Sequence, residues 1–337
     1  MNAARKLPPS LAGEGRGGAV TVSHPGSRRD RVLARIFHRS LPQGRARARR
    51  LTGLGLALPA LIFVFAFMVY PVASLLLLSF QEYSPLRSAV TSFAGLANYV
   101  WLVGSDLVHQ SIWVTVVFTA ASVAIEMVIG LAIAVLLAKL VVELRSRPGR
   151  LLTGLLGGVF ILPFATPAVA GAIAWKTLLH PQFGPVDALL HTDIAWFAQF
   201  PLASVIVADA WKMMPFVLFL MFAAVLSIEP EQYEAARLDG ANGWQEFRYL
   251  TFPLILPVVA VTAAFRAVDA FTKIFDTVFV TTGGGPATDT QVFPLLIWRT
   301  TFDYLNFGHA SALAVVAIIV SALLGVSLLA IRRASST

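Results

Sequence analysis

The sequence predicts an all-α membrane protein with six transmembrane helices, and three observations support this prediction. First, 57% of the 337 residues are hydrophobic and only 13% are charged, whereas about a quarter of the residues of a soluble domain are charged. Second, six apolar segments are long enough to cross a bilayer. Third, basic residues gather on alternate connections between these segments. The period-two alternation of a membrane-spanning barrel is missing, so helices are the expected form.

Residues 1–50 are predicted to be a disordered, basic tail that precedes the membrane domain of residues 51–333. The tail contains 12 Lys and Arg residues but only Glu14 and Asp30 as acidic residues, and it has almost no apolar run. Such a composition cannot bury enough apolar surface to fold. The charge of the tail accounts for the high isoelectric point of the chain, so we expect membrane lipid and no nucleic acid as a partner.

Each of the six apolar segments meets or exceeds the length of about 20 residues that a spanning helix needs. The expected spans are residues 51–80, 111–138, 151–179, 201–228, 252–282 and 305–331. The first and last contain no formal charge. Pro163 and Pro167 should kink or break the third span locally, because proline cannot donate the backbone hydrogen bond of a helix interior.

The distribution of basic residues predicts that both chain ends lie in the cytoplasm. With the N-terminus inside, 20 Lys and Arg residues fall on cytoplasmic segments, and only Arg87 and Arg299 fall on outer loops. Cytoplasmic loops carry such an excess. The same orientation places the polar loop of residues 229–251 in the cytoplasm.

The loop of residues 229–251 is predicted to form two short helices. Pro230 suits the first turn of a helix, and Gly240 suits a left-handed stop at its end. A second short helix should follow and end near Leu250. We expect four apolar or aromatic side chains to pack the loop against the span ends, namely Tyr233, Leu238, Trp244 and Phe247.

The residues of this loop follow a long, spaced pattern. The chain reads E-A-A-R-L-D-G-A from Glu234, and Phe247, Pro253 and Pro257 follow at fixed distances. The pattern resembles the conserved loop of permease subunits of bacterial binding-protein-dependent ABC importers, except that Leu250 stands where Ile is commoner. The resemblance implies the type I ABC importer permease fold with a cytoplasmic coupling helix. It also implies that the residues coupling the permease to its ATPase are Glu234, Ala235, Ala236, Asp239 and Gly240.

Three shorter patterns indicate the carbohydrate-uptake group of this family. Residues 95–99 are similar to its G-L-x-N-Y, residues 180–184 to its N-P-x-x-G with His180 in place of Asn, and residues 282–286 to its T-G-G-G-P. The triple glycine is not a phosphate-binding P-loop, because no Gly-Lys-Ser/Thr occurs in the chain. We therefore expect no cofactor in this chain, and ATP and Mg²⁺ on a partner ATPase.

The resemblance implies the membrane-spanning subunit of an ATP-driven sugar importer, located as a multi-pass protein in the bacterial cytoplasmic (inner) membrane. The expected partners are a second permease subunit, a dimer of ATPase subunits, an extracytoplasmic sugar-binding protein and the sugar itself. The sequence does not specify the sugar. A permease for a polyol or a glycerol phosphate ester is the alternative within the family, and an ion-coupled carrier is the alternative outside it.

Four charged residues of the fifth span, Arg266, Asp269, Lys273 and Asp276, are spaced by three, four and three positions. This spacing places them on one stripe of a helix with opposite signs adjacent. Charges in a bilayer rarely face lipid. Two interpretations stay open: the stripe forms a polar wall of the translocation path, or its ion pairs pack the bundle.

Polar residues of other spans are interpreted mainly as packing groups. Asp209 and Lys212 are predicted to form an ion pair within the fourth span, and Glu126 is predicted to bond to a neighbouring side chain. Trp211 and Phe271 offer flat faces to a sugar ring, and ordinary packing is the alternative.

Signatures of catalysis are missing from the sequence. None of the six histidines begins an H-E-x-x-H pattern, no G-x-S-x-G pattern occurs, and there is no cysteine. We therefore expect no catalytic residue, no metal ligand and no enzymatic activity of the chain itself.

Overall fold

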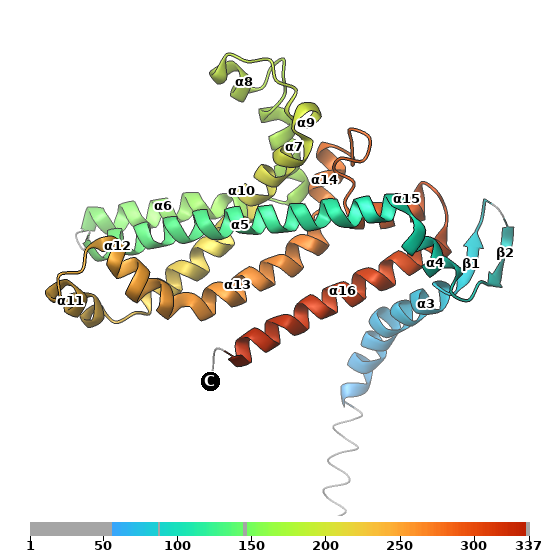
Figure 1. The fold of residues 1–337 in the computed structure, drawn as a ribbon, viewed down its shortest axis with the longest axis horizontal. Helices are drawn as coiled ribbons and strands as arrows, with labels where there is room; N and C mark the ends of the chain where they lie inside the picture. The colour runs from blue at the N-terminus through green and yellow to red at the C-terminus, as the bar shows by residue number, and fades with distance from the viewer. Residues whose placement is uncertain (1–55, 87, 144–146, 335–337) are drawn as a thin grey trace, which may run out of the picture. The chain divides into compact units, whose positions relative to one another are not determined.

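The computed structural model describes residues 56–86, 88–143 and 147–334, so the predicted tail of residues 1–50 lies outside the described part. The chain divides into two units, Met1–Phe67 and Met68–Thr337. The described end of the first unit is helical, and the rings of Phe63 and Phe67 lie 4.7 Å apart. The second unit contains the helical bundle (Figure 1).

Five helices in the described part of the chain are long and apolar enough to cross a membrane, and a bent helix pair raises the total to six. The predicted class, an all-α protein of six spans, is therefore confirmed. The five straight candidates are Leu56–Leu78, Asp106–Val142, Pro201–Leu226, Gly243–Lys273 and Phe307–Val326. The first comprises the π-helical turn η1 (Phe65–Val69) and helix α3 (Tyr70–Leu78), and the last lies in α16 (Phe307–Ala334).

The third span is broken, as its prolines predict. Helix α6 (Arg147–Ala165) and helix α7 (Ala168–Leu178) meet at an angle of 100°. Pro167 stands at the break with an extended ψ of 142°, and residues before a proline are also driven out of the helical region. Lys212 donates a hydrogen bond of 2.5 Å to the carbonyl oxygen of Thr166 at the same point.

The fifth span begins earlier and ends earlier than predicted. One continuous helical segment is formed by helix α12 (Gly243–Gln245), the π-helical turn η2 (Glu246–Thr251) and helix α13 (Phe252–Lys273). Helix α14 (Phe275–Thr281) follows after Ile274. The sequence predicts a new start at Pro253 instead. A wide π-turn directly before a proline relieves the clash of its ring with the preceding turn, so the helix can continue.

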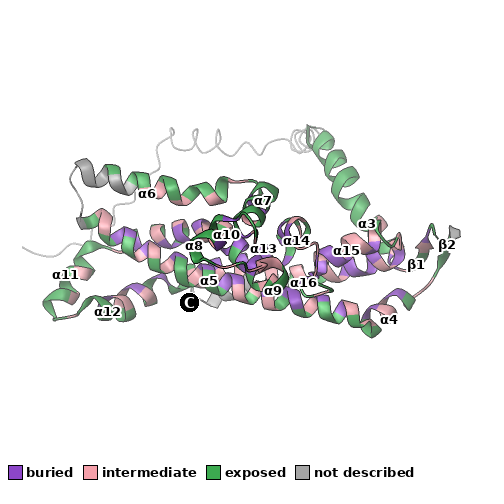
Figure 2. Cartoon of the chain, turned by 90° about the horizontal axis from the view of Figure 1, so that it is seen from above, coloured by how far each residue is buried: buried purple, intermediate pink, exposed green. Residues whose placement is uncertain are grey.

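The core lies between α5 (Asp106–Glu143), α10 (Pro201–Leu226) and α13. Helices α5 and α10 are in close contact because Gly130 has no side chain: a Cβ atom there would lie 2.9 Å from Val217 Cγ1. Figure 2 shows buried residues on the facing sides of these helices and exposed residues on their outer sides. Exposed apolar side chains such as Val128, in the middle of α5, are those expected to meet lipid.

A small β-hairpin and two short helices complete one end of the bundle. Strands β1 (Gln81–Ser84) and β2 (Ser88–Phe93) pair antiparallel and precede helix α4 (Ala97–Gly104). Helix α15 (Phe293–Phe302) packs its first turns into the core between α14 and α16. This hairpin was not expected from the sequence. Its four-residue strand and exposed turn give too weak a pattern to distinguish from a loop.

Candidate functional site

The loop of residues 229–251, called the knob below, forms a compact helical hairpin at the end of α10 (Figure 1). Helix α11 (Pro230–Leu238) begins with its proline at the first position. It ends at Gly240, whose φ of +83° is the predicted left-handed stop. The side chain of Asn242 then accepts hydrogen bonds from the backbone of Trp244 and Gln245 and closes a capping box. Such a cap stabilises a helix start by about 1 kcal/mol.

Two side-chain contacts fix α11 against η2. The Arg237 Nε atom lies 2.8 Å from Glu246 Oε1, and the hydroxyl groups of Tyr233 and Thr251 are 3.0 Å apart. Tyr233 and Arg237 are four positions apart and therefore share one face of α11. That face is directed to η2.

The predicted packing of the knob is only half right. Tyr233 makes its contact, and the ring of Phe247 lies 5.9 Å from that of Phe252. Leu238 and Trp244, however, are 89% and 69% exposed, so the expectation that they pack on the span ends is wrong. Leu238 follows Arg237 by about 100° around α11, which turns its side chain away from η2.

Most of the residues predicted to couple the knob to a partner are accessible. Glu234, Ala235, Asp239 and Gly240 are exposed, and Ala236 is half-buried. Ala236 borders a shallow cavity of about 390 Å³ between α11 and η2. The cavity is lined by Ala236, Asp239, Gly240, Ala241, Gln245, Glu246, Tyr249 and Leu250. The structure thus brings three predicted residues to one concave surface, with Glu234 and Ala235 outside it.

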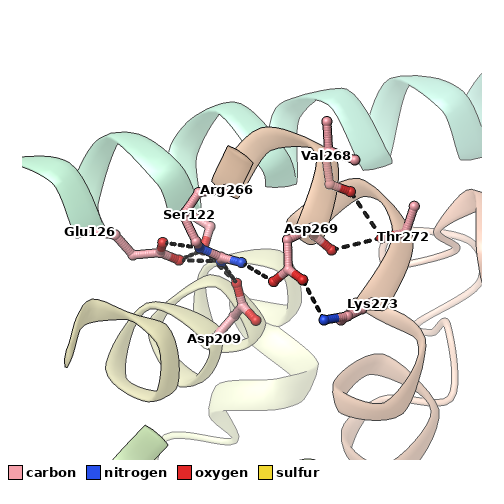
Figure 3. A network of polar contacts seen from close by, with 8 residues as sticks. All are labelled: Ser122, Glu126, Asp209, Arg266, Val268, Asp269, Thr272 and Lys273. Atoms are coloured by element: carbon pink, nitrogen blue, oxygen red, sulfur yellow. Dashed lines mark hydrogen bonds and ion pairs between the residues drawn. The ribbon is translucent and has the colours of Figure 1, made fainter. Parts of the chain in front are cut away.

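A second polar feature is the buried guanidinium group of Arg266, which joins three helices (Figure 3). Its Nε and Nη2 atoms donate to both oxygens of Glu126 on α5, at 2.6 and 2.7 Å. Nη2 also lies 3.3 Å from Asp209 on α10, and Nη1 lies 2.5 Å from Asp269 on α13. Arg266 is 1% exposed. The prediction that Glu126 bonds to a neighbour is confirmed, and that neighbour is Arg266.

These contacts distinguish the members of the charged stripe. Asp269 connects the buried cluster to the surface, because its other oxygen lies 2.6 Å from the Nζ atom of Lys273. Lys273 itself is exposed, and so is Asp276, which has neither a hydrogen bond nor an ion pair among the described residues. Arg266 and Asp269 are therefore joined in buried ion pairs, and Lys273 is exposed but paired with Asp269. Asp276 is exposed and has no such partner among the described residues.

The same stripe borders a cavity of about 340 Å³ at the break of the third span. The cavity lies beside the first residue of α7 and is lined by Ala168, Asp209, Lys212, Met213, Arg266, Asp269, Ala270, Thr272, Lys273, Phe275, Asp276 and Thr277. All four residues of the stripe belong to this lining. Charged and hydroxyl side chains in a cavity within a membrane bundle are typical of a polar substrate path.

Three sequence predictions differ from this arrangement. Phe271 does not line the cavity, because it packs in the core against Phe293, with ring centres 6.4 Å apart. Trp211 also lies outside the cavity lining and makes an edge contact with Trp175. Asp209 and Lys212 do not pair directly: Asp209 accepts from Ser122 and Arg266, whereas Lys212 bonds to the backbone of Thr166.

Sequence reasoning missed Ser122 and Thr166. The Ser122 hydroxyl lies 2.7 Å from Asp209 Oδ2 and 2.9 Å from Glu126 Oε1, so the two carboxylates share its single proton. Its position four residues before Glu126 was a usable signal, since residues four apart share a helix face. No sequence signal marked Thr166, because the contact uses its backbone carbonyl. Within the described ranges, no group of His, Cys, Asp and Glu side chains is arranged to hold a metal ion.

The segment between α7 and α10 is organised by the buried carboxylate of Asp187, which lies on α8 (Pro185–Leu190). This carboxylate accepts hydrogen bonds from Thr192 Oγ1 at 2.6 Å, from the backbone of Ile194 at 3.1 Å and from Trp196 Nε1 at 2.9 Å. The hydrogen bond from Thr192 is the main cause that lowers the pKa of Asp187 below its ordinary value of 3.8.

This lowered pKa predicts acid sensitivity of the segment 185–196. A carboxylate with a depressed folded-state pKa contributes stability above its unfolded pKa, and that stability is lost as the pH falls through the folded pKa. Hydrogen exchange of this segment should therefore stay slow from neutral pH down to about pH 4 and rise below it. Asp187→Asn should exchange fast already at neutral pH. Slow exchange in that variant would contradict an organising role of the carboxylate.

Comparison with known proteins places these features in context. Residues 127–336 match the family described as binding-protein-dependent transport system inner membrane component. The chain is 30% identical over 266 residues to the trehalose/maltose transport system permease protein MalF of Thermococcus litoralis, covering 76% of this chain and 84% of the relative. It is also 30% identical to the trehalose transport system permease protein SugA of Mycobacterium tuberculosis, covering 85% of this chain and 89% of the relative.

Solved structures agree with these matches at the level of the fold. A chain of a bacterial ABC transporter involved in the import of the acidic polysaccharide alginate superposes with a TM-score of 0.72 at 20% identity. The superposition covers 88% of this chain and 99% of that chain. The predicted six-span permease fold is therefore confirmed.

Proposed function

Because this chain belongs to the family of binding-protein-dependent transport system inner membrane components, we propose that it is a membrane-spanning subunit of an ATP-driven carbohydrate importer. The single observation that carries the proposal beyond the family is the pairing of two features. A polar cavity lies inside the bundle, and a rigid, exposed knob lies at the end of α10, the helix that provides Asp209 and Lys212 of the cavity.

The knob is proposed to bind a separate ATPase subunit, and ATP and Mg²⁺ are bound by that partner. Glu234, Ala235, Ala236, Asp239 and Gly240 are the proposed contact residues. The capping box and the Arg237–Glu246 pair make the knob rigid. The knob continues directly through η2 into α13. A displacement of the knob by the ATPase would thus be passed along one helical segment to Arg266 and Asp269.

The exposure of Leu238 adds an apolar contact to this proposed interface. Full burial of a leucine side chain stabilises a contact by about 1.5–3 kcal/mol, so Leu238→Ser should weaken ATPase binding by roughly 10- to 100-fold. Capture of the ATPase by the purified chain measures this effect. Leu189→Ser is the matched control, since Leu189 is a leucine on α8, away from the knob, that is 79% exposed. Equal capture by Leu238→Ser and the wild type would remove Leu238 from the interface.

The cavity beside α7 is proposed to lie on the carbohydrate path. Its cations are already bonded to acceptors of the protein: Arg266 to three carboxylates, Lys273 to Asp269, and Lys212 to the backbone of Thr166. The carboxylate of Asp276 has no such partner among the described residues. The cavity therefore offers a free hydrogen-bond acceptor, which suits the hydroxyl donors of a carbohydrate.

Asp276→Asn should raise the KM for carbohydrate uptake by roughly 10-fold, because a hydrogen bond to a charged group contributes about 1.5–3 kcal/mol. Assembly with the partner subunits should not change, since Asp276 is exposed and unbonded. Uptake kinetics measure the first effect, and co-purification of the subunits measures the second. Asp303→Asn, an exposed aspartate outside the cavity, is the control. An unchanged KM for Asp276→Asn would place this residue off the path.

The orientation follows the basic residues: the knob and both chain ends are proposed to face the cytoplasm. In the bacterial cytoplasmic membrane, the outer side of the protein would then comprise the hairpin of β1 and β2, helix α4, and the segment between α7 and α10. A sugar-binding protein would dock on that outer side, and a second permease subunit would close the cavity. Trehalose and maltose, named for the relatives, are the first substrates to test.

Uptake of radiolabelled trehalose and maltose by cells with and without this chain is the direct test. Uptake that requires the chain and its partner ATPase would support the proposal. Uptake that persists without the ATPase would favour an ion-coupled carrier. Competition by polyols and glycerol phosphate esters, but by no sugar, would favour the other substrate classes.

A further inference from the structure

Helix α4 buries Asn98 and Leu102, and its exposed face carries apolar residues alone. Asn98 is 4% exposed, whereas Val100 and Val103 are 70% and 69% exposed. All the exposed residues of α4 are apolar, and they are Ala97, Val100, Val103 and Gly104. Leu96, which directly precedes the helix, is exposed as well. Figure 2 shows this exposed surface along α4.

The inward polar residues fix α4 to the end of α3. The side-chain amide of Asn98 donates to the carbonyl oxygens of Ser79 and Gln81, at 2.8 and 2.9 Å. The hydroxyl of Tyr99 lies 2.8 Å from that of Ser79. These carbonyl groups follow the last turn of α3, where no helical donor is left for them. The G-L-A-N-Y pattern of residues 95–99 therefore holds α4 at the level where α3 ends.

Helix α4 directly precedes a span whose exposed side chains change from polar to apolar. Helix α5 begins at Asp106, two residues after α4 ends. Its first turns expose His109 and Gln110, and the next turn exposes Trp113. Tryptophan side chains gather at the boundary between lipid and water. Helix α4 thus lies at this boundary, beside two segments that are themselves expected to be surrounded by lipid.

The residues expected on an exposed helix face differ between water and lipid. A helix on a protein surface in water directs polar residues outward. A helix at a membrane surface directs apolar residues into the acyl region and satisfies its polar groups elsewhere. The distribution on α4 fits the second case, because the side chains of Asn98 and Tyr99 are bonded within the protein.

We propose that α4 is a membrane-surface anchor whose face of Leu96, Ala97, Val100, Val103 and Gly104 is embedded in lipid. The contacted lipid belongs to the leaflet at the bundle end opposite the knob, because α5 and α10 run side by side from that end toward the knob. The anchor fixes the depth of α3 in the bilayer through the bonds of Asn98. This role is independent of the substrate and of the ATPase.

The absence of cysteine from the sequence allows a direct test with single spin labels. Val100→Cys and Val103→Cys probe the anchor. Val128→Cys in the middle of α5 is the lipid reference, and Glu231→Cys on the exposed surface of α11 is the water reference for the chain without its partners. The full-length chain is placed in vesicles of phosphatidylethanolamine and phosphatidylglycerol, both alone and with its partner subunits. Collision rates with oxygen, which concentrates in lipid, are compared with those of a water-soluble nickel chelate.

The anchor predicts that oxygen collisions exceed nickel collisions at both test positions, as at the lipid reference, with and without the partner subunits. Nickel collisions that dominate, as at the water reference, would overturn the proposal and place α4 in water. If oxygen and nickel collisions both became rare only in the presence of the partner subunits, the proposal would also be overturned, because a protein would then cover the face. Asn98→Leu should lower the excess of oxygen collisions at Val100→Cys by releasing α4 from α3. An unchanged ratio would overturn the depth-fixing role.

Discussion

Glu234→Lys is expected to abolish carbohydrate uptake while the chain still inserts into the membrane. Glu234 is exposed on α11 and makes no contact that holds the knob together. The substitution reverses a charge at the proposed ATPase interface, and an unpaired charge at an interface costs several kcal/mol. Uptake and the amount of membrane-inserted chain are measured together. Glu82→Lys is the control, because Glu82 is an exposed glutamate on β1, away from the knob.

Gly240 tests the same interface through the backbone. Its φ of +83° is closed to proline, whose ring fixes φ near −65°, whereas asparagine tolerates the left-handed region. Gly240→Pro should therefore abolish uptake, and Gly240→Asn should retain most of it. Retained uptake in both Glu234→Lys and Gly240→Pro would show that the knob does not couple transport to the ATPase.

The fold could be predicted from the sequence because the bilayer imposes simple rules. Six apolar segments and a strong bias of basic residues were sufficient for the class. Pro167 predicted the break of the third span, and Gly240 predicted the end of α11. The hairpin of β1 and β2 and the continuous helix through Pro253 were not predictable, because both depend on local backbone geometry that no residue pattern records.

At the charged site, too, the sequence predicted some features and not others. The spacing of Arg266, Asp269 and Lys273 correctly placed these three residues on one helix, α13, whereas Asp276 lies on the next helix, α14. All four line one cavity. Helical spacing cannot show which groups of other helices they meet. Glu126 lies 140 positions from Arg266 in the sequence, yet it provides both oxygens to that guanidinium group. For the same reason, Lys212 was assigned to the wrong partner.

Both interpretations of the stripe hold for different parts of it, because burial decreases along the stripe from Arg266 to Asp276. Arg266 is completely buried, Asp269 is buried but touches both neighbours, and Lys273 and Asp276 are exposed. The buried end has the geometry of a structural clamp, since one guanidinium group joins α5, α10 and α13. The exposed end has the geometry of a binding surface. Substitutions should therefore shift from effects on folding to effects on transport along the stripe.

Arg266→Met is expected to be the most destabilising substitution at this site. It leaves the carboxylates of Glu126, Asp209 and Asp269 close together, with the exposed Lys273 as the remaining ion-pair partner. Removal of one partner from a buried ion pair costs about 3–5 kcal/mol. The folded yield and the thermal midpoint of the detergent-solubilised chain should both fall. Lys273→Met should change them little, because its side chain is 75% exposed and exposed pairs contribute about 0–1 kcal/mol.

A compensated variant separates stability from transport. Glu126→Gln and Asp209→Asn, added to Arg266→Met, remove two of the unpaired charges and leave Asp269 paired with Lys273. Replacement of a whole buried ion network by neutral groups is often tolerated, so the thermal midpoint should recover largely. Uptake should remain low, because Asp209 and Arg266 also line the cavity. Recovery of full uptake together with stability would mean that the cluster only packs the bundle, and that the path depends on the exposed residues Lys273 and Asp276.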